Sequence, residues 1–158
     1  MGLDAYVYCD CFEQNRLHSV PNQQWQVRVA DDGSRMTESD DLEDQIAFDQ
    51  WNASACDHED GIWMSERIGN ISLVATLRTL LEAEVHRLPV LLENVLYSGS
   101  HCGDWLTLEQ VKALEQELKI ASSICCPDPV ADQYLQNFIR TLQRLLSCSL
   151  QLHKPIAF

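Results

Sequence analysis

Basic residues are scarce in this chain. Its 158 residues include 11 Lys and Arg against 24 Asp and Glu, so the formal net charge is −13 at pH 7. Binding to nucleic-acid phosphates needs a basic surface, and this balance argues against such a partner. Glycine and proline are also few, at 6 and 5 residues. The length and the 46% of apolar residues predict a single domain, residues 1–158, with its own core.

Signals for membranes and export are missing as well. No stretch approaches about 18 uninterrupted apolar residues, so no membrane-spanning helix and no membrane partner are predicted. Residues 1–4 do not resemble the start of a signal peptide, because no basic region precedes an apolar one. Seven cysteines, an odd number, favour reduced thiols over a disulfide scaffold. We therefore expect a cytoplasmic protein.

Well-known catalytic motifs are also absent. The sequence has no P-loop, no G-x-G-x-x-G, no G-x-S-x-G and no EF-hand loop, which favours a binding protein over an enzyme. Residues 98–105 still hold a weak catalytic candidate, with Cys102 as nucleophile, His101 as base and Asp104 beside them. The alternatives are a helix end at Gly99, or a partner-binding loop in which Trp105 is the anchor.

Strands are expected mainly over residues 1–37. Apolar and polar residues alternate over 3–12 and again over 25–29, which is the period of a strand. The Asp32-Gly33 pair offers a tight turn to a short return strand near 35–37. A further short strand is indicated at 62–64, and the apolar tail 155–158 predicts a final strand or a docked end.

Helices are expected over most of residues 41–150. The first covers about 41–54, with Asp40 and Glu43 as a reciprocal capping pair. Others begin after Asn70, near Pro89 and after Thr107, and the last has apolar residues at helical spacing from 135 to 149. The predicted class is α+β: a small N-terminal antiparallel sheet packed with a larger helical part of about five helices. A two-lobed arrangement is the alternative.

The acids are concentrated in residues 31–60, where eleven of them face one base, Arg35. Such a local field can steer a cationic partner, so we hypothesise an acidic face that docks onto a basic, toxin-like protein. The alternative is a solvated surface that keeps the protein soluble. The residues expected to bind the partner are Asp40, Asp41, Glu43, Asp44, Asp49, Trp51 and Trp105.

A second hypothesis concerns a metal. Cys9 and Cys11 would lie on the same side of a strand, and Cys56 and His58 would do the same if their segment is extended. Three thiolates and one imidazole are a known tetrahedral zinc set. The sequence therefore offers a zinc-binding protein, with a structural site or a hydrolytic one, as the alternative function. Buried cysteines acting as small apolar side chains would give the same pattern.

Several segments also suggest relatives. They are the segments MGLD, YCDCFE, CDHEDG, RIGN and KPIAF, at residues 1–4, 8–13, 56–61, 67–70 and 154–158. In these segments the chain resembles a group of small acidic bacterial proteins of unassigned function. That resemblance implies a bacterial, cytosolic protein and brings no established site residues. In general type the chain is similar to immunity proteins, small acidic inhibitors of bacterial toxins, which implies a toxin-like basic partner.

Overall fold

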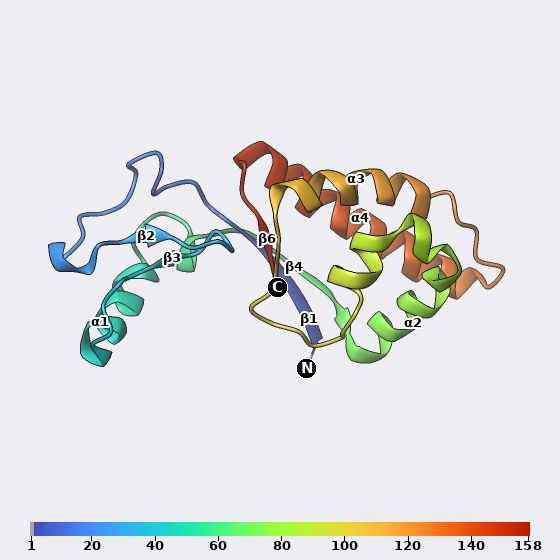
Figure 1. The fold of residues 1–158 in the computed structure, drawn as a ribbon, viewed down its shortest axis with the longest axis horizontal. Helices are drawn as coiled ribbons and strands as arrows, with labels where there is room; N and C mark the ends of the chain where they lie inside the picture. The colour runs from blue at the N-terminus through green and yellow to red at the C-terminus, as the bar shows by residue number, and fades with distance from the viewer. Residues whose placement is uncertain (1) are drawn as a thin grey trace.

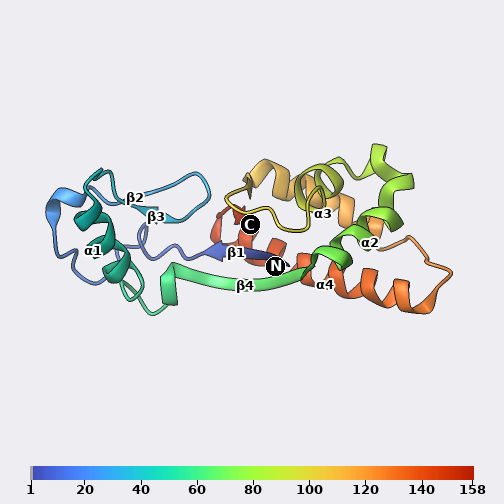
Figure 2. The same cartoon turned by 90° about the horizontal axis from the view of Figure 1, so that it is seen from below.

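The computed structural model describes residues 2–158 of the chain. The molecule is elongated, with a hairpin and one helix at one end and the remaining helices at the other (Figure 1). We call residues 9–61 the N-terminal lobe, and residues 2–8 with 62–158 the main body. Two long strands, β1 and β4, connect the two parts, and Figure 2 shows β4 running along the molecule toward α2. The α+β class predicted from the sequence is confirmed.

Four antiparallel strands form the sheet of the main body, in the order β4-β1-β6-β5. Its strands are β1 (Gly2–Tyr8), β4 (Ile62–Asn70), β5 (Trp105–Leu106) and β6 (Ile156–Ala157). Tyr6 is the centre of the register, because it faces Ser65 on one side and Ala157 on the other. One face of β1, with Leu3, Ala5 and Val7, is buried, as the alternating sequence predicts.

Helices cover that buried face of the sheet. They are α2 (Ile71–Leu81), the π-helical η4 (Leu91–Val95), α3 (Leu108–Ala121) and α4 (Pro129–Leu152), and a short 3₁₀ segment, η3 (Glu82–Arg87), follows α2. The α4 helix packs against α3, β4 and β1, which makes it the centre of the main body. Its periodic apolar residues from Leu135 to Leu146 are buried in one core with the inward side chains of β1.

The N-terminal lobe has little regular structure and its own small clusters. It contains η1 (Gln23–Trp25), β2 (Arg28–Val29), β3 (Arg35–Met36), α1 (Leu42–Asn52) and η2 (Glu59–Gly61). The β2–β3 hairpin turns at Gly33, whose φ is +90°, as the sequence predicts. Trp25, Phe48 and Trp51 pack their rings together, with centroids 5.7–6.0 Å apart. No residue of this lobe belongs to the main-body core.

Three sequence-based boundaries are wrong. The first strand ends at Tyr8 and not at 12, because the following backbone turns back on itself through bonds such as Arg16 N–H to Cys11 O. The second predicted strand, 25–29, begins only at Arg28, since η1 precedes it. The short strand expected at 62–64 is the nine-residue β4, whose polar second half is held by pairing with β1.

The cap of α1 also differs from the prediction. Asp41, not Asp40, is the N-cap, and its carboxylate accepts hydrogen bonds from the N–H groups of Glu43 and Asp44. The cap moves by one residue because α1 begins at Leu42. The other predicted caps are confirmed: Asn70 caps α2, and Thr107 starts α3 with a reciprocal capping box.

The C-terminal tail joins the two parts of the molecule. It pairs with β1 through β6, as predicted for an apolar tail. Just before it, the buried Lys154 forms an ion pair with Glu13 of the N-terminal lobe. Pro155 lies so close to Gly33 that a Cβ there would be 3.0 Å from its Cγ. The hairpin turn is therefore packed directly against the end of the chain.

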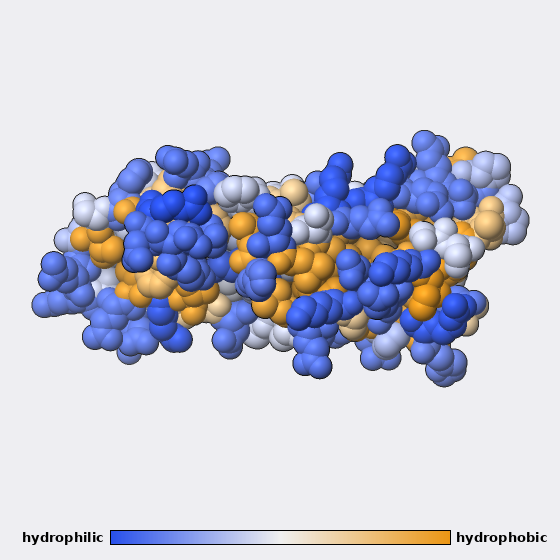
Figure 3. Space-filling model, turned by 90° about the horizontal axis from the view of Figure 1, so that it is seen from above, coloured by the Kyte–Doolittle hydropathy of each residue, from blue (hydrophilic) through white to orange (hydrophobic). Residues whose placement is uncertain are grey.

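Among residues 2–158, no helix has both the length and the apolar character that crossing a membrane requires. Over the helical part of the main body, apolar atoms show between polar side chains at the surface (Figure 3).

Candidate metal centre

The four residues predicted as metal ligands meet at the junction of the N-terminal lobe and β1. Cys9 and Cys11 follow the end of β1, while Cys56 and His58 lie between α1 and η2. The backbone ties the two segments together, because Cys9 N–H donates to Gly61 O at 2.8 Å. All three cysteines are buried, and Leu17 packs against them. The segment 56–58 is bent, yet it still presents both of its side chains to the cysteines.

The distances between these side chains suit one tetrahedral ion. The four ligand atoms all lie within 4.8 Å of one another. Cys9 Sγ is 3.8 Å from Cys56 Sγ, and His58 Nδ1 is 3.3 Å from Cys11 Sγ and 3.8 Å from Cys56 Sγ. Bonds of about 2.3 Å to sulfur and about 2.0 Å to nitrogen give tetrahedral edges of about 3.8 Å and 3.5 Å. The set is therefore nearly formed before any ion is added.

The protonation of the three thiols is uneven. Burial raises the pKa of Cys11 to about 12, helped by its hydrogen bond with Cys9, and burial raises the pKa of Cys9 as well. Burial also opposes ionisation of Cys56, but hydrogen bonds with His58 and Cys9 and the charge of Arg35 together outweigh it. They lower the pKa of Cys56 to about 7. Cys56 is thus the most acidic of the three thiols.

A second layer of side chains surrounds the ligands. The ring of Trp63, on β4, packs on His58 with centroids 4.6 Å apart and limits the orientation of the imidazole. The guanidinium of Arg35 reaches Cys56 Sγ at 3.6 Å and Asn52 O at 3.2 Å. Gly61 leaves room for it, since a Cβ there would lie 2.4 Å from Arg35 Nη2.

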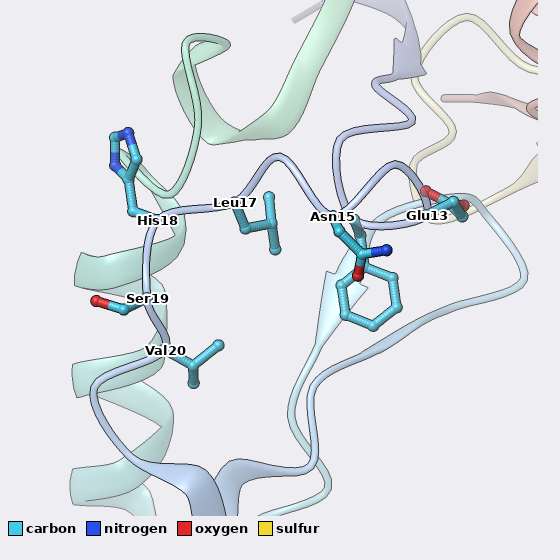
Figure 4. A pocket seen from close by; sticks show the side chains of 7 residues that line it. Glu13, Asn15, Leu17, His18, Ser19 and Val20 are labelled. Carbon is cyan, nitrogen blue, oxygen red and sulfur yellow. The ribbon is translucent and has the colours of Figure 1, made fainter.

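A shallow cavity of about 480 Å³ lies beside the metal candidates. It is formed by residues of the segment 12–20, and Leu17, which lines it, also packs against the three cysteines. Leu17 and Val20 point toward the side where Asn15 lies, whereas His18 and Ser19 point away (Figure 4). Leu17 thus connects the cavity wall with the cluster of cysteines, although none of the four candidate ligands lines the cavity.

The weak catalytic candidates lie far along the chain, in the loop before β5. The His101 ring is buried, with Nε2 3.1 Å from Val95 O and Nδ1 3.1 Å from an Asp104 oxygen. The Nδ1–Asp104 approach lacks hydrogen-bond geometry. Tyr97 donates its hydroxyl proton to Asp104. Because both imidazole nitrogens face these oxygens, His101 is not directed at the exposed Cys102.

This loop has a visible structural task. Gly103 N–H donates to Phe158 O, and Phe158 N–H donates to Asp104 O. The His101 ring packs on the Phe158 ring at 5.0 Å. The loop therefore clamps the C-terminal residue next to the sheet. Trp105 belongs to β5, is 40% exposed and pairs with Ala157, so it is not part of the α1 surface.

The predicted acidic face is smaller in the structure than in the sequence. Asp41 is the cap of α1, and Asp44 accepts hydrogen bonds from Trp25 Nε1 and Ser39 Oγ, which lower its pKa. Trp51 packs in the aromatic cluster. The residues of the predicted set that remain exposed on or beside α1 without such an engagement are Asp40, Glu43 and Asp49.

No family model, curated protein or solved structure matches this chain. The resemblance to small acidic bacterial proteins, and with it the immunity-type function, stays a prediction. The functional reading therefore depends on the geometry of the chain itself. Two residues that contact the candidate ligands, Arg35 at Cys56 and Trp63 at His58, were not expected from the sequence. Arg35 offered one signal, since it is the only base among eleven acids.

Proposed function

We propose that this protein binds one zinc ion through Cys9, Cys11, Cys56 and His58. The observation that supports it best is the convergence of four ligand atoms, from segments 47 residues apart, within 4.8 Å of one another. Four protein ligands leave no open position for a substrate or an activated water. The ion therefore has a structural role: it cross-links the first and last segments of the N-terminal lobe, which has only small clusters of its own.

The direct test is elemental analysis of the untagged protein, expressed with zinc present. We expect about one zinc per chain, and a Cys9→Ser/Cys11→Ser variant should retain less than about a tenth of it. A Cys102→Ser/Cys125→Ser variant is the matched control, because it also removes two thiols but both of these are exposed. If the parent protein contains no zinc above background and takes up none on titration, the proposal is wrong.

Binding of a basic protein is a second candidate function. It is favoured by one observation: α1 exposes Leu42 and Ile46, which are 69% and 51% accessible and one helical turn apart, beside Glu43 and Asp49. An apolar centre with an acidic rim suits a partner that has a basic rim. Co-expression with a basic toxin is the experiment, and a Leu42→Ser/Ile46→Ser variant should lose any protection. Equal protection by the parent and the variant would count against this surface.

A further inference from the structure

The single base of the acidic block is buried at the metal candidates. Arg35 is 9% exposed, although arginine is seldom buried unless its charge is paired. No carboxylate forms an ion pair with it in the part of the chain that the structure describes. Its polar contacts are the sulfur of Cys56 and the carbonyl of Asn52. A buried guanidinium that faces one sulfur and one carbonyl, with no carboxylate, is only partly compensated.

A metal-loaded site would supply the negative charge that the guanidinium lacks. Three thiolates and a neutral imidazole around Zn²⁺ leave the centre with one net negative charge, mostly on the sulfurs. The surrounding acids cannot offset this charge, because Asp57, Glu59 and Asp60 are themselves negative and exposed. Arg35 is in contact with the centre, because its Nη1 donates to Cys56 Sγ while its Nη2 donates to Asn52 O.

The backbone is arranged to keep the guanidinium there. Arg35 begins β3 and pairs with Val29 across the hairpin. Its side chain lies over Gly61, whose φ of +71° and missing Cβ make room for the guanidinium. The carbonyl of the same Gly61 accepts from Cys9 N–H, so Arg35 and the ligand segments share one support.

We propose that Arg35 is the charge-compensating residue of the zinc centre, holding the sulfur of Cys56 and offsetting the single negative charge of the loaded site. This inference rests on the proposed zinc binding and adds a positioning residue to it. Arg35 does not ligate the metal. It stabilises the loaded state more than the empty one, because the loaded centre carries a full net negative charge beside the guanidinium.

The test measures Co²⁺ and Zn²⁺ affinity by competition with a chromophoric chelator. Arg35→Met should weaken binding by about 10- to 100-fold, the usual effect of removing an outer-shell partner. Arg35→Lys keeps the charge and should stay within a few-fold of the parent. Arg28→Met is the matched control, because Arg28 is in the same hairpin but its side chain is 54% exposed. It changes the net charge equally and should leave the affinity unchanged.

Two further readouts separate charge from shape. The thiolate-to-Co²⁺ charge-transfer band should move to longer wavelength in Arg35→Met, because the sulfur loses a hydrogen bond and a nearby positive charge. The loss of affinity should persist in about 1 M salt, where exposed charges are screened but buried ones much less so. If Arg35→Met does not fold, Arg35→Gln decides, since an amide can still bond to Asn52 O without the charge.

Some outcomes would overturn the inference. Equal affinity and an unchanged band in Arg35→Met show that the charge is not used. If Arg35→Lys and Arg35→Met lose metal affinity to the same extent, the arginine acts through its shape alone. Both results leave zinc binding intact, whereas a parent protein that binds neither ion refutes the proposed function itself.

Discussion

Cys56 ionises differently from the two cysteines beside it. All three thiols are buried, and burial alone would raise the pKa of each. At Cys56 the hydrogen bonds with His58 and the positive charge of Arg35 reverse that effect. The difference comes from a few neighbours and not from the degree of exposure.

Alkylation should reveal this order in the metal-free protein. The pKa of Cys56 is about 7 and that of Cys11 about 12, so raising the pH from 6 to 8 should ionise Cys56 and leave Cys11 protonated. Iodoacetamide should therefore modify Cys56 before Cys9 and Cys11, with a rate that rises through about pH 7. Peptide mass spectrometry measures it, with the exposed Cys102 as the reference. Added zinc should protect all three, and equal rates at Cys9 and Cys56 would contradict the expected order.

Gly61 supplies a second prediction for a single residue. Gly61→Ala places a Cβ 2.4 Å from Arg35 Nη2 at a φ of +71°. The control Gly103→Ala has a similar φ of +80° but meets nothing within 4 Å, so it carries only the backbone strain, about 1–2 kcal/mol. Gly61→Ala should lower the free energy of unfolding by about 1–3 kcal/mol more than the control, because it also overpacks the site. Denaturant unfolding compares the two, and equal losses would show that Arg35 can move aside.

Helix ends in this chain are satisfied by local and by distant side chains. Asn70 and Thr107 are caps that the sequence shows directly, since they precede their helices. The start of η4 is different. The N–H groups of Val90 and Leu91 donate to the buried carboxylate of Glu117, which comes from α3. Only the packing of α3 against η4 brings that carboxylate to the helix end.

The cap of α1 gives a prediction at the scale of an element. Asp41→Ala should lower the free energy of unfolding by about 1 kcal/mol, since two N–H groups of the first turn lose their acceptor. Asp40→Ala is the adjacent control with the same charge change, and its effect should stay within about 0.5 kcal/mol. Thermal and denaturant unfolding measure both. If Asp40→Ala lowers the free energy of unfolding more than Asp41→Ala does, the N-cap is Asp40, as the sequence first suggested.

The molecule has one large hydrophobic core, and no residue of the N-terminal lobe belongs to it. The core of the main body contains the inward residues of β1 and the buried faces of α2, η4, α3 and α4. The N-terminal lobe depends on its aromatic cluster, the three cysteines, and contacts with the tail at Lys154 and Pro155. A metal ion would therefore matter most to the lobe.

Chelation should separate the two parts. Removing the metal should speed amide exchange at Cys9, Arg16 and His18, whose N–H groups bond to Gly61, Cys11 and Ala55 around the site. Amides of α3 and α4 should exchange as before, since their core does not include the lobe. Hydrogen-exchange mass spectrometry measures this, and Cys9→Ser/Cys11→Ser should show the same pattern without chelator. Uniform loosening of α4 would show instead that the two parts unfold together.

The sequence by itself determined the elements with a strong periodic pattern and two of the helix caps, Asn70 and Thr107. The apolar spacing from Leu135 to Leu146 fixed α4, and alternation fixed the buried face of β1, because each pattern suits only one backbone period. It also singled out the four residues that cluster in the structure, but it could not show that they meet, since 47 residues separate the two pairs.

Tertiary structure decided what local pattern could not show. The second half of β4 is polar and becomes a strand only because β1 pairs with it. Asp44, which was expected to face a partner, accepts a hydrogen bond from Trp25 Nε1, 19 residues away in the sequence. Arg35 looked like the exception in an acidic surface, yet the hairpin turns its side chain inward to Cys56. The physical reason is common to all three, because each depends on a partner brought close by folding and not by sequence.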